Sequence, residues 1–318
     1  LDMISYAIAV EELARVDAST AIVISVTNSL VCYPLEKFAS DEQKEKFLKP
    51  LASGEKLGAF SLTEPGSGSD AGDMKTTAVR DGDDYILNGT KNFITSGKSC
   101  DLMLVFVVTD KSKGSKGTSG FIVEKGMPGF EVGKKESKLG IRASDTVSVS
   151  FENCRVPAAN RIGDEGMGFK IALTALNSGR IGVAAQALGI AQGAFEEAVK
   201  YSKEREQFNK PIAKFQAIQF KIARMATDIE TARLLLYSAA AKKDRHENFI
   251  KEAAMAKLHC SEVAVRTTLE AIQIHGGYGY VKEYPVERFM RDSKITTIYE
   301  GTNEVMHLII AENVIGRI

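Results

Sequence analysis

The chain has 318 residues, more than one average domain, so two or three packed units are expected. Hydrophobic residues make up 44%, an ordinary share for a globular protein, and Lys plus Arg equals Asp plus Glu at 41 each. This charge balance argues against nucleic acid or an anionic membrane surface as a partner, so any anionic ligand must be held by local groups.

Neither a metal centre nor a membrane span is expected. The cysteines lie far apart, without the paired spacing of metal sites, and the histidines are equally scattered. Reduced, buried thiols are expected at Cys32, Cys100, Cys154 and Cys260. The segment nearest to a span of about 20 apolar residues, 7–26, is interrupted by charges, and no signal-peptide pattern is present.

Residues 1–58 are predicted to be helical. The residues that recur at helical spacing in the first segment are Ile4, Ala7, Ile8, Glu11 and Ala14. Residues 40–43 (SDEQ) form a capping-box pattern, which opens a helix expected to stop before Pro50.

A turn rich in Gly, Ser and Pro follows two strand-like residues at 60–70 (FSLTEPGSGSD). Such a turn presents backbone N–H groups and hydroxyls without bulky side chains in the way, which suits a ring edge and a pyrophosphate. It is not a dinucleotide fingerprint, because the G-x-G-x-x-G spacing and a βαβ unit are missing. It is not a P-loop either, because no Gly-Lys-Ser or Gly-Lys-Thr follows.

Residues 59–158 are predicted to form a β-domain. Short β-branched or apolar runs at 85–87, 102–108, 121–123 and 146–151 are separated by Asp-Gly, Lys-Gly and Pro-Gly turns. The basic run at 111–117 (KSKGSKG) is predicted to be a flexible, solvated loop, with a contact to ligand phosphates as the alternative.

From residue 163 onward the pattern is helical again. Long helices are predicted at 166–203 and 248–274, and another follows Gly301. Between the first two, a narrow seam for a neighbouring helix repeats in steps of four and three. Its members are Ile218, Ile222, Met225, Ile229, Ala232 and Leu236. Four long amphipathic helices predict a bundle.

Residues 299–304 (YEGTNE) place a carboxylate directly before a glycine, after the apolar run 295–298. Burial in an apolar pocket raises the pKa of a carboxylate toward neutrality and makes it a usable general base. Gly301 would let a ligand approach the backbone closely. The alternative interpretation of Glu300 is an acidic residue that favours the positive end of the last helix dipole.

Taken together, these motifs resemble the acyl-CoA dehydrogenase flavoprotein family, and within it the short-chain, butyryl-CoA dehydrogenase-like branch. The resemblance covers the chain from end to end. Beyond 60–70 and 299–304, it rests on residues 91–97 (KNFITSG), 205–208 (REQF), 273–279 (QIHGGYG) and 288–292 (RFMRD). Any one motif could recur by chance, but the ordered set is specific.

The resemblance implies an α+β multidomain chain with the acyl-CoA dehydrogenase fold. Its parts would be the remainder of an N-terminal helical domain at 1–58, a middle β-domain at 59–158 and a C-terminal four-helix bundle at 159–318. Family members usually carry a few more helices before this point, so the N-terminal helices are expected to be partly missing.

The implied reaction is the FAD-dependent α,β-dehydrogenation of a short-chain acyl-CoA to the trans-2-enoyl-CoA. Glu300 matches the family's catalytic base for the α-proton, and flavin N5 accepts the hydride. Neither a metal nor a nucleophile is required. The alternative base position of some long-chain and isovaleryl relatives is Gly179 here, which leaves Glu300.

The residues that the resemblance assigns to FAD fall into three groups. Contacts to the isoalloxazine and its turn are expected from Phe60, Leu62, Thr63, Gly68, Ser69, Phe93, Ile94 and Thr95, with the Thr95 hydroxyl at N5. Distal contacts to the FAD of a neighbouring subunit are expected from Arg205, Gln207, Phe208, Gln216, Gln273, Ile274, Gly276 and Gly277. Thr302, Asn303 and Glu304 would touch the cofactor again at a helix N-terminus. The plain alternatives are a strand-forming threonine at Thr95 and a solvated helix-end arginine at Arg205.

Substrate contacts are expected from Ser69, Asn177, Ser178, Gly179, Arg180, Tyr278 and Gly301. Many relatives have Asp where this chain has Asn177, and an amide keeps the hydrogen-bonding capacity but loses the charge. Tyr278 would shorten the acyl pocket or, alternatively, belong to the bundle core. One methylene is worth about 1–3 kcal/mol in a pocket, so the motifs do not rank butyryl, isobutyryl and 2-methylbutyryl groups.

The resemblance also implies partners and a compartment. Electrons would pass to an electron-transfer flavoprotein, and the chain would form a homotetramer, a dimer of dimers. The compartment would be the bacterial cytoplasm or, in a eukaryote, the mitochondrial matrix. The competing functions are an enoyl-CoA reductase that uses the same site, an acyl-CoA oxidase, and a flavin-free helical interaction protein. Oxidases of this fold are usually longer, and the retained motif residues speak against loss of the flavin.

Overall fold

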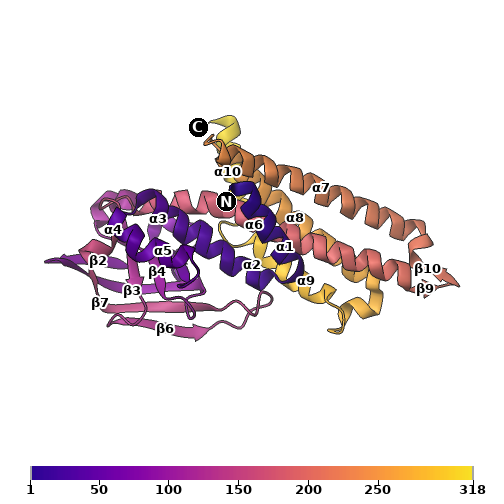
Figure 1. Cartoon of the computed structure of the whole chain (residues 1–318), viewed down its shortest axis with the longest axis horizontal. Coiled ribbons are helices and arrows are strands. Elements are labelled where there is room, and N and C mark those ends of the chain that lie inside the picture. The colour runs from indigo at the N-terminus through magenta and orange to yellow at the C-terminus, as the bar shows by residue number, and fades with distance from the viewer. Residues whose placement is uncertain (1, 317–318) are drawn as a thin grey trace. The chain divides into compact units, whose positions relative to one another are not determined.

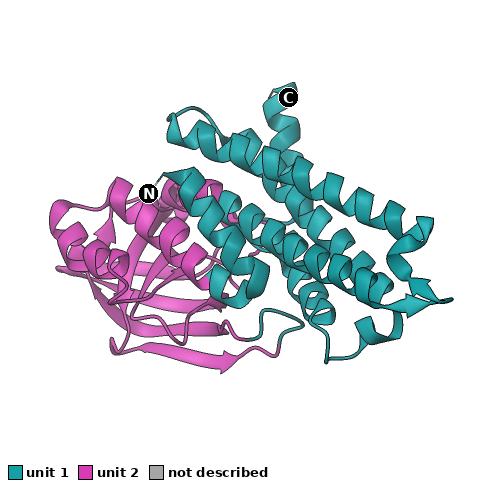
Figure 2. Cartoon of the chain, turned by 45° about the vertical axis from the view of Figure 1, so that its right-hand side comes forward, with its two compact units in different colours: residues 1–22, 138–142, 180–318 teal, residues 23–137, 143–179 magenta. Residues whose placement is uncertain are grey.

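The computed structural model describes residues 2–316, which group into two compact units (Figure 2). Unit 1 contains Leu1–Ile22, Lys138–Arg142 and Arg180–Ile318, and unit 2 contains Val23–Ser137 and Ala143–Gly179. Each unit has hydrophobic cores of its own. The predicted order of helices, strands and helices is confirmed. The domain boundaries at 58/59 and 158/159 stay a prediction.

Unit 2 is built around a sheet with short helices over it (Figure 1). Its strands are β1 (Gly58–Ser61), β2 (Thr77–Asp81), β3 (Asp84–Thr95), β4 (Leu102–Val108), β5 (Thr118–Glu124), β6 (Phe130–Lys135), β7 (Thr146–Pro157) and β8 (Arg161–Ile162). They pair in the order β6-β7-β3-β2-β4-β5-β8, and β1 pairs with β4 in parallel. Its helices are α3 (Tyr33–Phe38), α4 (Asp41–Gln43) and α5 (Lys49–Ala52), with π-helical turns at Val26–Cys32 and Lys44–Leu48.

Strand β4 is buried on both faces, which explains its uninterrupted apolar sequence. Leu104 and Phe106 pack in one core with Leu35 of α3. Because successive strand residues point to opposite faces, Val105 belongs to the second core, with Leu87 of β3. The strand therefore joins two hydrophobic layers of the unit.

Strand β3 contains a bulge. Its register against β7 shifts between Lys91 and Ile94, and Phe93 within this stretch has a φ of 56°. Bulges re-aim side chains, and a bulky residue in the left-handed region is uncommon. Phe93 is 62% exposed as a result, whereas Ile94 returns to the core at 2% exposure.

Unit 1 consists mainly of helices. They are α1 (Met3–Val16), α2 (Ala18–Ser25) up to Ile22, α6 (Gly168–Glu204) from Arg180, α7 (Gln216–Asp244), α8 (Ile250–His275), α9 (Val286–Ser293) and α10 (Asn303–Ile315). A short hairpin of β9 (Glu206–Gln207) and β10 (Lys210–Pro211) joins α6 to α7. The predicted seam on α7 is buried at Met225, Ile229, Ala232 and Leu236.

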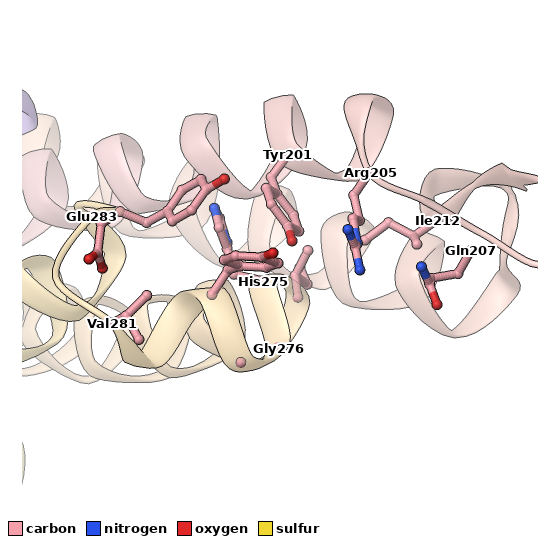
Figure 3. A pocket seen from close by; sticks show the side chains of 12 residues that line it. Tyr201, Arg205, Gln207, Ile212, His275, Gly276, Val281 and Glu283 are labelled. Atoms are coloured by element: carbon pink, nitrogen blue, oxygen red, sulfur yellow. The ribbon is translucent and has the colours of Figure 1, made fainter.

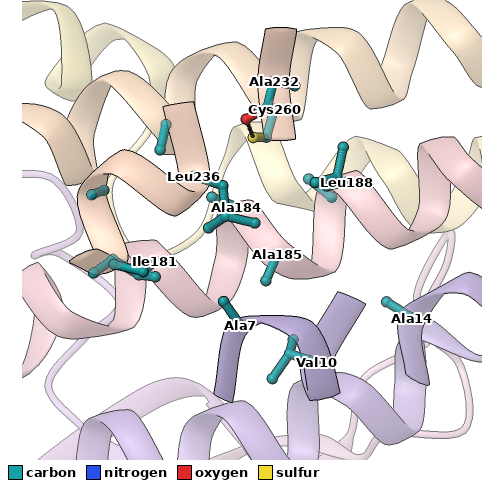
Figure 4. Packing of buried hydrophobic residues seen from close by; sticks show 14 of the residues in the cluster. Ala7, Val10, Ala14, Ile181, Ala184, Ala185, Leu188, Ala232, Leu236 and Cys260 are labelled. Carbon is teal, nitrogen blue, oxygen red and sulfur yellow. Dashed lines mark hydrogen bonds between the residues drawn. The ribbon is translucent and has the colours of Figure 1, made fainter. Parts of the chain in front are cut away.

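Small residues let α1 and α6 pack closely (Figure 4). Ala7 and Ala185 belong to the same core, and a Cβ on Gly189 would lie 2.2 Å from the Glu11 carbonyl oxygen. Only glycine allows this approach of two backbones. The Glu11 side chain is buried too, and its charge is paired with Arg233 of α7, whose Nη2 lies 2.8 Å from Oε1.

Two local predictions are wrong. The helical course that begins after Ser40 does not stop before Pro50, because α5 includes Pro50 in its first turn, where a missing N–H costs no hydrogen bond. Residues 111–117 are not a flexible loop but form 3₁₀ turns (Lys111–Gly117), although 111–116 are exposed to solvent as predicted. The Asp110 carboxylate anchors them by accepting the Ser112 N–H at 3.0 Å.

One segment is apolar enough to span a membrane by length and composition alone. It is Ala18–Phe38, of 21 residues, so the expectation that no segment approaches this length is corrected. In the structure, 67% of its apolar window is buried inside the protein, and packing accounts for its composition.

Candidate active site

Glu300 lies in the turn before α10 and has an uncommon backbone conformation. Its φ is 54°, and the next residue, Gly301, has a φ of 97°. A left-handed conformation costs a non-glycine residue about 1–2 kcal/mol and persists only where the surroundings determine it. Residues that carry a side chain rarely adopt a φ of 97°, so the second position favours glycine.

The Glu300 carboxylate is buried near two cations. Among residues 2–316, neither of its oxygens has a hydrogen-bond partner, and both are shielded from solvent. Burial raises the pKa of Glu300 to about 7, against the charges of Arg180 and Lys257. Arg180 of α6 is 4% exposed, and burial lowers its pKa to about 10. The carboxyl group is therefore suited to exchange a proton near neutral pH.

Lys257 of α8 contacts the backbone of the same turn. It is fully buried, and its Nζ donates to the Gly301 carbonyl at 2.7 Å and to Asn303 Oδ1 at 2.9 Å. Ser261, one helical turn further along α8, donates to the same Asn303 oxygen at 3.1 Å. Burial lowers the pKa of Lys257 to about 7, although Glu300 opposes this.

A second set of hydrogen bonds fixes the turn from α6. The Tyr299 hydroxyl donates to Gln186 Oε1, and Gln186 Nε2 donates to the Ala18 carbonyl at 2.8 Å. Gln186 is fully buried. Burial raises the pKa of Tyr299 far above its usual value, so its hydroxyl stays a donor. The turn is thus held from two helices.

A pocket of about 790 Å³ lies elsewhere in unit 1, at the end of α8 (Figure 3). It brings together six of the predicted site residues: Arg205, Gln207, Ile274, Gly276, Gly277 and Tyr278. The Arg205 guanidinium lies over the Tyr278 ring, 5.5 Å from its centroid. In Figure 3, Arg205 and Gln207 lie at one end of the pocket and Glu283 at the other.

His275 lines this pocket with an unused ring nitrogen. Its ring stacks on Tyr201 at 4.1 Å, and Nδ1 lies 2.8 Å from the Ala271 carbonyl, so this nitrogen carries the proton. Burial lowers the pKa of His275 and keeps the ring neutral. Nε2 is then a buried acceptor, without a partner among the residues that the structure describes. The pocket itself offers an arginine donor and an aromatic face.

In unit 2, a buried ion pair anchors the turn at 60–70. Lys91 Nζ, fully buried on β3, lies 2.8 Å from Glu64 Oε1 and donates to the Leu62 carbonyl at 3.0 Å. The same Glu64 oxygen accepts the Thr76 N–H at 3.0 Å. Burial lowers the pKa of Lys91 to about 8, and the Glu64 charge opposes this.

The expected flavin residues of unit 2 lie on joined segments. The Asn92 N–H donates to the Thr63 carbonyl at 2.8 Å, which ties the turn to β3. Thr63 and Thr95 are half-buried, and Phe93 is exposed. The side chains of Leu62 and Ile94 are in hydrophobic cores, so only their backbone groups are available to a ligand.

Several other predicted residues are not brought into either group. Phe208, Gln216 and Gln273 are exposed and do not line the pocket, and Gly68 and Ser69 are exposed in their turn. Asn177, Ser178 and Gly179 lie on the part of α6 that belongs to unit 2, whereas Arg180 belongs to unit 1. Tyr278 lies with Arg205 in the pocket and not in the Glu300 turn.

Lys257, Ser261, Gln186 and His275 contribute to these sites but were not predicted. For Lys257 a signal exists, because it interrupts the buried face of α8. The other members of that face include Ala253, Ala256, Cys260 and Ala264. Lysine is almost never fully buried without a polar partner, so its place on an apolar helix face predicts an internal contact.

No group of three or more His, Cys, Asp or Glu side chains that could hold a metal occurs within residues 2–316. The four cysteines are free thiols.

Comparison with known proteins extends these findings. Three family models match the chain: "Acyl-CoA dehydrogenase, N-terminal domain" at residues 1–55, the middle domain at 59–154 and the C-terminal domain at 166–315. A curated relative from Megasphaera elsdenii, "Acyl-CoA dehydrogenase, short-chain specific", is 56% identical over 309 residues, which cover 97% of this chain and 81% of the relative. The curated relatives include bacterial proteins and mammalian proteins named as mitochondrial.

Two solved structures are similar over nearly the whole chain. Butyryl-CoA dehydrogenase from Megasphaera elsdenii has a TM-score of 0.98 and 55% identity, with 99% of this chain and 82% of that chain covered. The second structure is described as the electron transferring flavoprotein of Acidaminococcus fermentans, in connection with flavin-based electron bifurcation. It has a TM-score of 0.99 and 55% identity, with 100% of this chain and 83% of that chain covered. With three domains matched in order and more than half of its residues identical to a relative, the chain belongs to the acyl-CoA dehydrogenase family.

Proposed function

We propose that this protein is a FAD-dependent short-chain acyl-CoA dehydrogenase, which converts a short-chain acyl-CoA to the trans-2-enoyl-CoA with Glu300 as the base. The observation that carries the proposal is the Glu300 carboxylate. It is buried, has no hydrogen-bond partner among the described residues, and has its pKa raised to about 7 by burial. In a member of this family, such a group is suited to take the α-proton of an acyl thioester.

The residues present fit FAD, which members of this family bind. In unit 2, the exposed Phe93 ring and the half-buried Thr63 and Thr95 would hold the isoalloxazine, together with backbone groups of Phe60, Leu62 and Ile94. In unit 1, the pocket with the Arg205 guanidinium suits a ligand with a phosphate. When bound, oxidised FAD supplies the acceptor for the β-hydrogen.

The chain's own residues would move and hold the proton. Ionised Glu300 removes the α-proton, and Arg180 and Lys257 favour that ionised form. The Glu300 N–H would donate to the thioester carbonyl, where negative charge builds as the proton leaves. Gly301 leaves room for the thioester next to the backbone. The substrate contacts proposed at Ser69, Asn177, Ser178, Gly179 and Tyr278 complete this assignment.

The same site could serve mainly to reduce an enoyl-CoA, and this is the second candidate. The observation that favours it is the similarity, at a TM-score of 0.99, to a structure described in connection with flavin-based electron bifurcation. A site that abstracts the α-proton in one direction returns it in the other, so Glu300 would then be a general acid.

We assign an electron-transfer flavoprotein as the redox partner and a homotetramer as the assembly. The similarity to the structure described as an electron transferring flavoprotein supports the first, and a tetramer is consistent with the family. For the compartment, we infer the cytoplasm of a bacterium or the mitochondrial matrix of a eukaryote, in line with the relatives.

The test is anaerobic addition of butyryl-CoA to the purified protein. We expect a yellow protein whose flavin absorbance bleaches on addition of the substrate. A colourless preparation that FAD does not reconstitute would refute the proposal. If crotonyl-CoA restores the yellow colour of the chemically reduced protein much faster than butyryl-CoA bleaches the oxidised protein, the second candidate is favoured.

A further inference from the structure

Lys257 is buried, and no carboxylate among the described residues forms an ion pair with it. It is 0% exposed, on the buried face of α8, where Ala253, Ala256 and Cys260 are close to it along the helix. Among residues 2–316, both of its hydrogen bonds go to neutral acceptors, the Gly301 carbonyl and Asn303 Oδ1. Burial of an ammonium is costly when no carboxylate pairs with it. Since an apolar side chain would pack in this core at lower cost, the lysine serves the turn that it contacts.

One of the two acceptors lies in the part of the turn with positive φ values, and the other follows it. Gly301 follows Glu300 directly, and Asn303 is the first residue of α10. The two distances are 2.7 Å and 2.9 Å, and Ser261 supports Asn303 at 3.1 Å. The φ of 54° at Glu300, a non-glycine residue, persists only when neighbouring groups hold it. Lys257 is placed to do so.

The same ammonium acts on the Glu300 carboxylate by its charge. Arg180 from α6 and Lys257 from α8 favour the ionised carboxylate, while Glu304 of α10 interacts with Lys257. Tyr299, the neighbour of Glu300, remains neutral because burial raises its pKa. Without Lys257, Arg180 would be the one described cation acting on the carboxylate, and the pKa of Glu300 would rise.

We propose that Lys257 is a positioning residue for the general base, whose side chain fixes residues 299–303 and thereby the direction of the Glu300 carboxylate. This inference rests on the proposed function, since the direction matters only if Glu300 takes the substrate proton. Lys257 acts through Glu300 and is not assigned a contact with the substrate.

The first test is Lys257→Met in the FAD-loaded full chain with butyryl-CoA. Methionine keeps the apolar stem and removes the ammonium. We expect kcat to fall about 10- to 100-fold, since a misplacement of about 1 Å costs this much, and KM to change less than about threefold. The rising limb of the pH profile should move up by about half a pH unit or more. Lys251→Met, on the same helix with a side chain 39% exposed, is the matched control and should keep the parent kcat.

The second readout does not depend on turnover. In hydrogen–deuterium exchange, the peptide that contains residues 299–303 should exchange about tenfold faster in Lys257→Met, while peptides of the α1–α6 core are unchanged. The flavin absorbance per subunit should match the parent. A kcat within about twofold of the parent, or an unchanged exchange rate at 299–303, would overturn the proposal.

Two further variants keep the test decisive. If Lys257→Met does not fold, Asn303→Leu removes one of the lysine's acceptors at similar volume, and we expect the same loss in kcat with little change in KM. A parent-like kcat in folded Asn303→Leu would contradict the positioning role. Glu300→Gln separates failure of the proposed function from failure of the role of Lys257. Full turnover in this variant would refute the proposed function itself. If Glu300→Gln is inactive and Lys257→Met is not impaired, only the role of Lys257 is wrong.

Discussion

At the scale of the residue, Glu300 combines a strained backbone with a carboxylate that is shielded from water. Its φ of 54° turns the side chain into a region where no described group accepts or donates a hydrogen bond to it. An unpaired buried polar group is expensive in a folded protein, so it marks a place where a ligand completes the set of contacts. Chemistry at this position can be tested directly.

Replacing Glu300 by Gln should abolish proton abstraction and leave binding intact. The amide is close in shape to the carboxyl group but does not take up a proton near neutral pH, so we expect kcat to fall by about 10³-fold or more. The dissociation constant for butyryl-CoA should change only a few-fold. Stopped-flow bleaching and equilibrium titration measure the two quantities, with Glu247→Gln at an exposed site as the control. Residual activity within tenfold of the parent would place the base elsewhere.

The pH dependence of turnover follows from the same group. Burial raises the pKa of Glu300 from 4.5 to about 7, so the active, ionised form increases as the pH rises. We therefore expect kcat/KM for butyryl-CoA to increase between about pH 6 and pH 8. Arg180 and Lys257 are the cations that face the group, and loss of a proton from Lys257 would broaden this rise. Initial rates with an artificial electron acceptor would show it, and a profile already flat at pH 6 would indicate a carboxyl group with its ordinary pKa.

At the scale of the element, the turn at 60–70 depends on strand β3. Lys91 on β3 holds the Leu62 carbonyl and the Glu64 carboxylate, and Asn92 holds the Thr63 carbonyl. Leu62 and Thr63 are also the residues proposed to meet the flavin. Strand β3 therefore sets the geometry of the turn, through the buried ion pair of Lys91 and Glu64.

Lys91→Met should destabilise unit 2 more than removal of both charges does. Without the lysine, Glu64 is left as an unpaired buried charge, which costs about 3–5 kcal/mol. Lys91→Met/Glu64→Gln leaves no unpaired charge and should recover part of the loss. Thermal unfolding of the parent, Lys91→Met and the double variant gives the order of their stabilities. FAD titration should show weaker binding by Lys91→Met than by the parent. The opposite order, with the double variant less stable, would contradict this role of the ion pair.

How far the sequence predicts these elements depends on the range of the contacts. Helix and strand positions follow from local periodicity, and the predicted fold class and the buried seam of α7 are confirmed. The motif at 299–304 identifies Glu300, but Lys257 reaches it from another helix, and no local pattern specifies which turn a buried lysine contacts. The continuation of α5 through Pro50 was missed because the π-helical turn before it puts the proline in a first turn. The roles of the individual FAD and substrate residues stay predictions.

At the scale of the whole molecule, unit 1 exposes large aromatic side chains. Phe208 at the α6–α7 hairpin is 87% exposed, and Phe220 on α7 is 69% exposed. Aromatic residues dominate the energetics of protein interfaces when they become buried. These side chains are therefore suited to contacts in the proposed tetramer, whose subunits would share the distal FAD contacts.

Phe220→Glu should disrupt this assembly. A charge in a buried apolar contact is unfavourable, so light scattering after size exclusion should show a smaller species than the parent tetramer. Because distal FAD contacts are proposed to come from a neighbouring subunit, the flavin content per subunit should fall with it. Asn248→Glu, an exposed site after α7, is the control. A tetrameric Phe220→Glu protein with full flavin content would place the interface elsewhere.

Strand β4 makes the chain prone to aggregation as long as folding is incomplete. Its seven residues, Leu102–Val108, carry no charge, no proline and no glycine, and both faces need a covering layer. A newly synthesised or heat-denatured chain exposes this stretch, and such segments associate with one another when their native neighbours are absent. Recovery of the protein from denaturant should consequently fall as its concentration is raised, and the cell must protect the nascent chain until the strands on either side of β4 have paired with it.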